Sequence, residues 1–244
     1  MLKSSIIVIM IIISTQFLPL QAQSFGFGCL GLVGGFGGYS YQQYKADGLN
    51  AFIDDYNSTL PDSVEKMNKF SDANGYRVGI NLFRGNLQGF ILTVKGFYQT
   101  VSSKKSITQG QYSATDFELK LKTWGIGIDL GTVITPSFSW KVLDATLLYT
   151  SGVFTNTYSN PTGTTIVQYS SQSSVGYAIG SGFILSILQD YVTLEGTASY
   201  TIFSIHEMKD DASEPLKIKN EPVKNFISNG GLNGVVQLNL SFPL

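Results

Sequence analysis

Apolar and polar residues alternate along most of the chain. Between residues 232 and 242 every second position holds Leu, Val, Phe or Gly, and the positions between them are mostly polar. A period of two is typical of a β-strand with one apolar and one polar face. The pattern recurs in earlier segments, although the first is so rich in glycine that its facing is unclear. Strands are therefore predicted over about 25–43, 75–84, 87–102, 113–134, 137–158, 166–188, 190–207 and 229–242.

The segment 113–134 changes its apolar face halfway along. The apolar residues of 117–121 have odd numbers, whereas those of 124–130 have even numbers. A bulge near Thr123 would bring both sets onto a single face. The alternative is a hairpin around one of the glycines of 125–127, which would give ten strands in place of eight.

Short and long connections alternate between the predicted strands. Outer-membrane barrels have short periplasmic turns and longer external loops. After residue 24 no apolar run is long enough for a membrane helix, and only helices and closed barrels satisfy their backbone groups in lipid. The sequence therefore predicts an all-β fold, an eight-stranded antiparallel up-and-down transmembrane barrel. Its tight turns are 84–86, 135–136 and 188–190, and its long external loops are 44–74, 103–112, 159–165 and 208–228.

Two of the predicted external loops show a distinct sequence pattern. Loop 44–74 contains Leu49, Phe52, Ile53 and Tyr56 at helical spacing, which predicts a short helix that ends at Pro61. The helix could cap the barrel mouth, contact a partner or fold back on its own loop, and the last is favoured. The final loop carries charges of both signs, which is typical of a solvated loop; it spans 208–228.

The first residues form a candidate export signal. Lys3 precedes an apolar run over 6–13, and Leu20-Gln21-Ala22-Gln23 follows. This order of a positive residue, a short apolar run and small residues predicts a signal peptide over residues 1–22. Residues 23–244 would then form one barrel domain in the cell outer membrane.

Composition supports a membrane barrel and argues against a nucleic-acid partner. Charged residues make up 14% of the chain and aromatic residues 13%, and 26 residues are glycine. A barrel face that meets lipid needs no charge. The net charge is −1 and no basic patch is present, so no nucleic-acid partner is expected. The single Cys29 excludes an intramolecular disulfide.

Charged residues on the polar strand faces are predicted to point into the barrel. The interior of an eight-stranded barrel is just wide enough for side chains to fill, and an unpaired buried charge is very costly. We therefore predict a salt-bridged core that blocks flow, with a narrow polar conduit as the alternative. The predicted lumen residues are Arg77, Lys95, Glu118, Lys120, Lys122, Asp144 and Glu195.

The sequence offers little catalytic or metal chemistry. Its one histidine, His206, lies two residues after Ser204 and next to Glu207. A serine hydrolase needs a histidine base and an acid that orients it, but neighbouring residues of a strand face opposite sides. One His, one Cys and the pair Asp54-Asp55 form no metal-ligand set. We predict no catalytic residue, no cofactor and no metal, and expect that the chain is not an enzyme.

In pattern the chain resembles the small outer-membrane barrels of the OmpX, OmpA and OmpW type, especially those of Bacteroidetes-like bacteria. The likeness rests on the ending of the signal, Leu20-Gln21-Ala22-Gln23, and on the final strand from Gly230 to Phe242. That strand is similar to the C-terminal signal read by the barrel-assembly machinery, although Pro243-Leu244 follow the aromatic residue. The resemblance implies contact with outer-membrane lipid and a role in envelope integrity, adhesion or small-solute passage.

Four functions follow as hypotheses. The favoured one is a structural or interaction role at the cell surface, carried by the loops and the protruding strand ends. The runner-up is a narrow porin-like channel for small solutes. A lipid A-modifying hydrolase and a soluble lipocalin-like binder are less favoured, and the binder would require the apolar faces to point inward.

Overall fold

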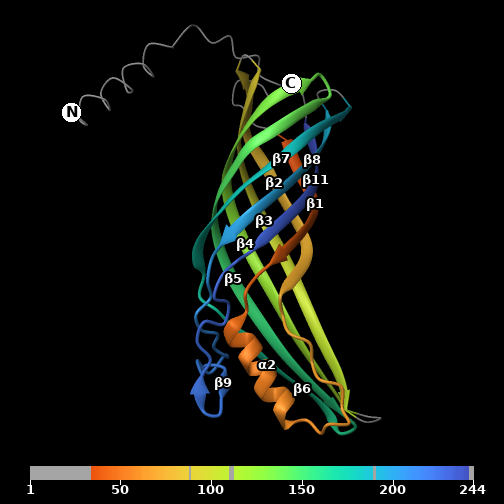
Figure 1. Ribbon diagram of the computed structural model, residues 1–244, viewed down its shortest axis with the longest axis vertical. Coiled ribbons are helices and arrows are strands. Elements are labelled where there is room, and N and C mark those ends of the chain that lie inside the picture. Colours follow the sequence, from red (N-terminus) through yellow and green to blue (C-terminus); the bar gives the residue numbers. More distant parts are fainter. Residues whose placement is uncertain (1–33, 88, 110–112, 189–190, 242–244) are drawn as a thin grey trace, which may run out of the picture.

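The chain forms a closed barrel. The computed structural model describes residues 34–87, 89–109, 113–188 and 191–241, so the predicted signal peptide, the start of the first predicted strand and Phe242 lie outside the described residues. Each strand pairs antiparallel with its neighbours, and the last pairs with the first (Figure 1), which confirms the predicted eight-stranded barrel. The ring contains β1 (Gly34–Gln43), β2 (Asp72–Leu87), β3 (Phe90–Gln109), β4 (Ser113–Thr135), β5 (Phe138–Asn160), β7 (Ser174–Leu188), β8 (Val192–Ile202) and β11 (Leu232–Ser241).

Four short elements lie outside the ring. They are α2 (Asp47–Thr59), β6 (Gly163–Ser170), β9 (Lys217–Ile218) and β10 (Glu221–Pro222). None of the helical structure in the described residues is long and apolar enough to cross a membrane.

The expected strand 166–188 is in fact two strands. β7 pairs with the first part of β5, up to Thr150, whereas β6 pairs with its last part, from Val153. Strand β5 is 23 residues long and therefore serves both partners, with the chain leaving the sheet at 171–173. The ten-strand alternative is wrong, because β4 pairs with β3 and β5 along its whole length.

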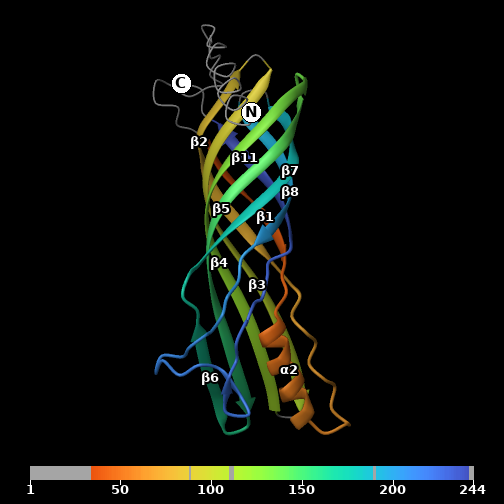
Figure 2. The ribbon, with the colours of Figure 1, turned by 60° about the vertical axis from the view of Figure 1, so that its left-hand side comes forward.

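The barrel has two parts that face their apolar residues in opposite directions. In the belt, the part that contains the short turns, large apolar side chains point outward and are exposed. In the extension, formed by the outer parts of β3, β4 and β5 with β6, α2, β9 and β10, apolar side chains point inward. Figure 2 shows the strands running on from the belt into the extension, with α2 and β6 on opposite sides of it.

This change of environment explains the switch of apolar face in 113–134. Burial alternates without interruption along β4, from Phe117 in the extension to Asp129 in the belt, so the predicted bulge at Thr123 is wrong. The strand keeps its phase, and the surroundings of its two faces change instead.

An aromatic row marks the junction of the belt and the extension. Tyr39 pairs with Tyr76, and Trp124 pairs with both Tyr98 and Tyr149. Tyr177 and Tyr200 continue the row on β7 and β8. A second set of exposed aromatic residues lies at the turn end of the belt: Phe83, Phe90, Phe138, Trp140, Phe183 and Tyr191.

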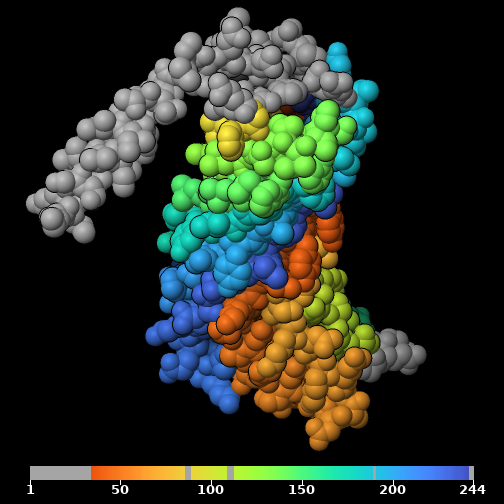
Figure 3. Space-filling view, turned by 45° about the horizontal axis from the view of Figure 1, so that its top comes forward, coloured from red at the N-terminus to blue at the C-terminus, as the bar shows by residue number. Residues whose placement is uncertain are grey.

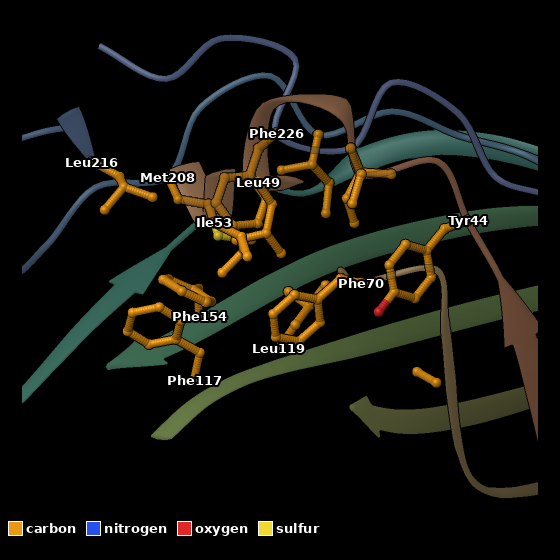
Figure 4. Packing of buried hydrophobic residues seen from close by; sticks show 14 of the residues in the cluster. Tyr44, Leu49, Ile53, Phe70, Phe117, Leu119, Phe154, Met208, Leu216 and Phe226 are labelled. Atoms are coloured by element: carbon orange, nitrogen blue, oxygen red, sulfur yellow. The ribbon is translucent and has the colours of Figure 1, made fainter. Parts of the chain in front are cut away.

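The extension has its own apolar core (Figure 4). Leu49 and Ile53 of α2 are fully buried, and the ring of Phe52 lies 5.6 Å from that of Phe117 and 6.1 Å from that of Phe154. The helix therefore closes the barrel mouth. It also folds back on its own loop, as expected, because the side chain of Asn57 donates to the Met67 carbonyl oxygen and accepts from its N–H. The favoured alternative is thus seen together with a second one, the closing of the mouth.

The charged loop 208–228 is only partly solvated. Its charged residues are exposed or half-buried, but its apolar side chains enter the core of the extension and are buried: Met208, Leu216, Val223, Phe226 and Ile227. In Figure 3 this segment (blue) lies beside α2 and the loop that follows it (orange). The expectation of a simply solvated loop is therefore wrong, because its buried apolar residues anchor the segment.

Several strand glycines lie directly under a ring from the neighbouring strand. Phe97 pairs with Gly125, and a Cβ at position 125 would lie 2.2 Å from the Phe97 ring. Phe36 covers Gly79 and Phe183 covers Gly196 in the same way. These contacts explain glycine within strands, where it otherwise weakens the sheet.

We expect Gly125→Ala to lower the free energy of unfolding by about 1–3 kcal/mol, because the Phe97 ring must leave its position. Urea unfolding of the folded barrel in lipid vesicles measures the change. Gly234→Ala is the matched control, since a Cβ at Gly234 meets nothing within 4 Å. An equal loss in both variants would contradict the explanation.

Candidate functional site: a filled lumen below a raised sheet edge

A cluster of ion pairs fills the lumen of the belt. Lys95 Nζ lies 2.8 Å from Asp129 Oδ1 and 2.6 Å from Asp144 Oδ2. Lys141 Nζ lies 2.9 Å from Asp144 Oδ2 and also pairs with Glu195. These five side chains are at most 4% exposed. Dense pairing of this kind is what buried charges require.

A sixth charge balances the cluster. Arg84 contacts Glu195 across the lumen, with 3.1 Å between the guanidinium nitrogen and Oε2. Three cations then face three carboxylates, contributed by β2, β3, β4, β5 and β8. The cluster thus ties together five of the eight strands of the ring.

Two bulges aim residues into this cluster. The β5 register shifts between Lys141 and Asp144, so Val142 and Leu143 both point outward and the two charged residues both point inward. In β2 the register shifts between Asn81 and Phe83, which turns Arg84 inward. Bulges re-aim side chains in this way. The predicted turn at 84–86 is wrong, because β2 continues through these residues to Leu87.

The structure brings together some of the predicted lumen residues and separates others. Arg77, Lys95, Asp144 and Glu195 are buried in the lumen. Glu118, Lys120 and Lys122 instead lie on the outer face of β4, and Glu118 pairs with Lys120 there at 3.7 Å. That part of the prediction is wrong because it assumed the bulge at Thr123.

Sequence reasoning missed Asp129, Lys141 and Arg84. Asp129 had a signal, because it lies between the outward residues Ile128 and Leu130. Simple alternation gave no signal for Lys141 or Arg84. A bulge after Lys141 and another before Arg84 reverse the phase of their strands.

A layer of amide and hydroxyl groups lies above the ion pairs. The Arg77 guanidinium donates to Gln99 Oε1 at 2.9 and 2.7 Å and lies 4.0 Å above the Phe97 ring. Asn233 and Gln42 continue the layer through a 3.0 Å hydrogen bond. The enclosed space left here is about 20 Å³, enough for about one water molecule. Ion pairs, this layer and the apolar core thus fill the described lumen at three successive levels.

The extension presents a free sheet edge. β6 pairs with β5 on one side, and at its end Ser170 exchanges two backbone hydrogen bonds with Lys209, at 2.7 and 2.9 Å, on the other. Backbone groups two residues apart point the same way, so those of Thr164, Ile166 and Gln168 point to the same open side. Within the described residues, no backbone hydrogen bond satisfies them there.

Two titratable groups of the extension are shifted by their surroundings. Burial raises the pKa of the Tyr44 hydroxyl, which donates to the Asp72 carbonyl oxygen at 3.1 Å. On the outer face, the hydrogen bond from Lys104 lowers the pKa of Asp116, with 2.8 Å between Nζ and Oδ2. Both pairs stabilise the extension, and Tyr44 and Asp72 also line a surface hollow of about 400 Å³.

The remaining chemical candidates, Ser204 and His206, lie in the segment that follows β8. His206 Nδ1 lies 3.3 Å from Asn225 Oδ1, and no hydrogen bond joins it to Ser204 among the residues that the structure describes. The described ranges contain no group of three His, Cys, Asp or Glu residues that could hold a metal ion.

No family model matches the chain, and no curated protein matches it. Among solved structures it is similar to Ail, the attachment invasion locus protein of Yersinia pestis, at 12% identity over 85% of this chain and 96% of that one, with a TM-score of 0.40. Ail in complex with the heparin analogue sucrose octasulfate gives 12% identity over the same shares, with a TM-score of 0.39. The outer membrane protease OmpT from Escherichia coli matches at 10% identity over 93% of this chain and 100% of that one, with a TM-score of 0.41. These are likenesses of shape, and the fold itself rests on the ring of paired strands.

Proposed function

We propose that the chain is an outer-membrane β-barrel with a filled lumen, which acts at the cell surface by binding a partner through its extension. The observation that carries this proposal is the reversal of facing at the aromatic row. Apolar side chains point outward below the row and inward above it. A wall surrounded by lipid and then by water has this pattern.

The dimensions of the belt support the membrane placement. At about 3.3 Å per residue and a tilt of about 40°, the stretch from Trp124 to Val133 spans about 23 Å. The apolar band of outer-membrane barrels is about 25 Å tall and has aromatic residues at both rims. The stretch of β4 from Ser113 to Thr123 would then stand well above the lipid.

The position of the short turns supports one orientation of the barrel in the membrane. The short turns between strands and the paired ends Gly34 and Ser241 lie at the belt end. Short turns belong on the periplasmic side, which supports an orientation with the extension outside the cell. Export would use the predicted signal peptide over 1–22, and insertion would use the barrel-assembly machinery.

Membrane fractionation with gels of boiled and unboiled samples tests the placement. We expect the chain in the outer-membrane fraction, with an unboiled band that migrates faster than the boiled one. Recovery as a soluble periplasmic protein would contradict the proposal. In planar bilayers the filled lumen should give a closed baseline, and a stable unit conductance would instead favour a narrow channel.

The extension suits a polypeptide partner. An open strand edge binds an extended segment by adding a strand, through main-chain hydrogen bonds. Ile166 is 65% exposed on this edge and would add an apolar contact. We propose no catalytic step, because the contacts around His206 and Ser204 assemble no nucleophile with its base.

Site-specific photo-crosslinking in intact cells tests the edge. A crosslinking residue at Gln168 is expected to yield a polypeptide adduct, whereas one at Thr155, in the middle of the sheet, is not. Ile166→Pro removes an N–H from the open side and should reduce the adduct at least tenfold. Ile166→Ala also removes the side chain but keeps the N–H, so it should reduce the adduct less. Equal yields from all of these variants would count against strand addition.

A further inference from the structure

The outer wall of the belt contains a large apolar hollow. It measures about 790 Å³ and spans the outward faces of β1 to β5 and the start of β7. Ligand pockets in proteins measure roughly 300–1,000 Å³. Its lining includes Gly35, Ile80, Gly96, Trp124, Ile126 and Tyr149.

Outward-facing glycines help to make the hollow. Gly35, Ile80, Gly96 and Ile126 form one row across four strands. A Cβ at Gly35 or Gly96 would meet nothing closer than 3.9 Å. The packing of the chain against itself therefore does not require these glycines, in contrast to Gly125, and the open space is available to something outside the barrel.

A cation lies directly above the hollow. Lys122 is on the same face of β4 as Trp124, two residues further into the extension. It is exposed, and no salt bridge of Lys122 is found in the part of the chain that the structure describes. Its neighbours across the sheet are Thr100 and Ser151, which both carry hydroxyl groups.

We infer that this wall binds an anionic phospholipid, with an acyl chain in the hollow and the phosphate beside Lys122. The inference rests on the proposed membrane placement and names a partner for the belt. An apolar hollow next to an unpaired cation at the aromatic rim matches a molecule that is apolar along its length and negative at its end. The two hydroxyls beside Lys122 supply hydrogen-bond donors for phosphate oxygens.

Tryptophan fluorescence can test the site in the folded full-length barrel. The chain has two tryptophans, so Trp140→Phe leaves Trp124, which lines the hollow, as the only reporter. The barrel is reconstituted in vesicles that contain brominated phosphatidylglycerol or brominated phosphatidylcholine as a minor component. At low salt we expect quenching by the anionic lipid at about fivefold lower content, since one lysine near the surface contributes about this factor.

Matched variants separate the two halves of the site. Lys122→Gln should abolish the preference for the anionic lipid and leave quenching by phosphatidylcholine unchanged, whereas Lys224→Gln, which removes a lysine of the distant loop, should change neither. The double variant Gly35→Leu and Gly96→Leu should weaken quenching by both lipids, and Gly234→Leu, which adds one leucine side chain outside the hollow, should not.

The outcomes also distinguish this inference from the proposed function. Equal quenching by both lipids, or an equal effect of Lys122→Gln and Lys224→Gln, would overturn the lipid site while the gel shift of the unboiled sample still showed an intact barrel. If the gel shift itself were missing from the unmodified chain, the membrane placement would fail first.

Discussion

Lys141→Met is expected to lower the free energy of unfolding by about 3–5 kcal/mol, because it leaves buried carboxylates without their cation. Lys141 contacts Asp144 and Glu195 and lies 3.4 Å from Asp129, and its side chain is 1% exposed. Methionine has a similar volume, so lost packing contributes little. Urea unfolding of the barrel in lipid vesicles, followed by fluorescence and by the gel shift, measures the change.

A double-mutant cycle separates charge balance from other effects. Adding Glu195→Gln to Lys141→Met leaves Arg84 and Lys95 opposite Asp129 and Asp144, so the cluster is again neutral. The double variant should therefore be less destabilised than the sum of the single variants, with a coupling of 1 kcal/mol or more. Lys122→Met, on the outer face, should change the stability by about 0.5 kcal/mol or less. Additive losses within the cluster would contradict the argument.

Phe154→Ala is expected to destabilise the extension by about 3–5 kcal/mol while the belt stays folded. Phe154 is fully buried, and its ring lies 5.5 Å from that of Phe117 and 5.6 Å from that of Phe226. It therefore joins the sheet, α2 and the segment after β8. A loss of this size should speed protease cleavage within 203–229 a hundredfold or more, provided that cleavage follows local opening.

Two observations check the locality of this effect. Val153→Ala, at the neighbouring position on the outer face, should leave the cleavage rate within a few fold of the unmodified chain. The gel shift of unboiled Phe154→Ala should persist, because the ring of eight strands does not depend on the core of the extension. Loss of the gel shift would mean that the two parts fold as one unit.

Alternation along the chain was sufficient to predict the barrel, because each strand in the belt keeps an apolar and a polar face. The helix at 47–59 was also predictable, since Leu49 and Ile53 are spaced for one buried face. The boundary between belt and extension was not, because a reversal of apolar face and a bulge give the same pattern in 113–134. The structure distinguishes them by the unbroken burial alternation of β4.

The lumen was predictable only where strands are regular. Lys95, Asp144 and Glu195 oppose apolar neighbours, so alternation places them inside. The inward direction of Lys141 and Arg84 results from bulges. These depend on pairing with neighbouring strands and leave no pattern in the local sequence. The division of 166–188 into two strands was not predictable for a similar reason. It depends on β5, which is long enough to pair with both β6 and β7.

The core of the extension joins segments from nearly opposite ends of the chain. The N–H of Gly48, at the start of α2, donates to the Asn225 carbonyl oxygen at 3.0 Å, and Leu49 and Phe226 lie in the same cluster. Contacts between residues this far apart in sequence form late, because the intervening chain must first be brought together. For the exported chain proposed above, the apolar face of α2 should therefore remain accessible until residues near 226 have followed. A chain that stalls before that point would expose Leu49 and Ile53 to envelope proteases, so burial of this helix would report that translocation is almost complete.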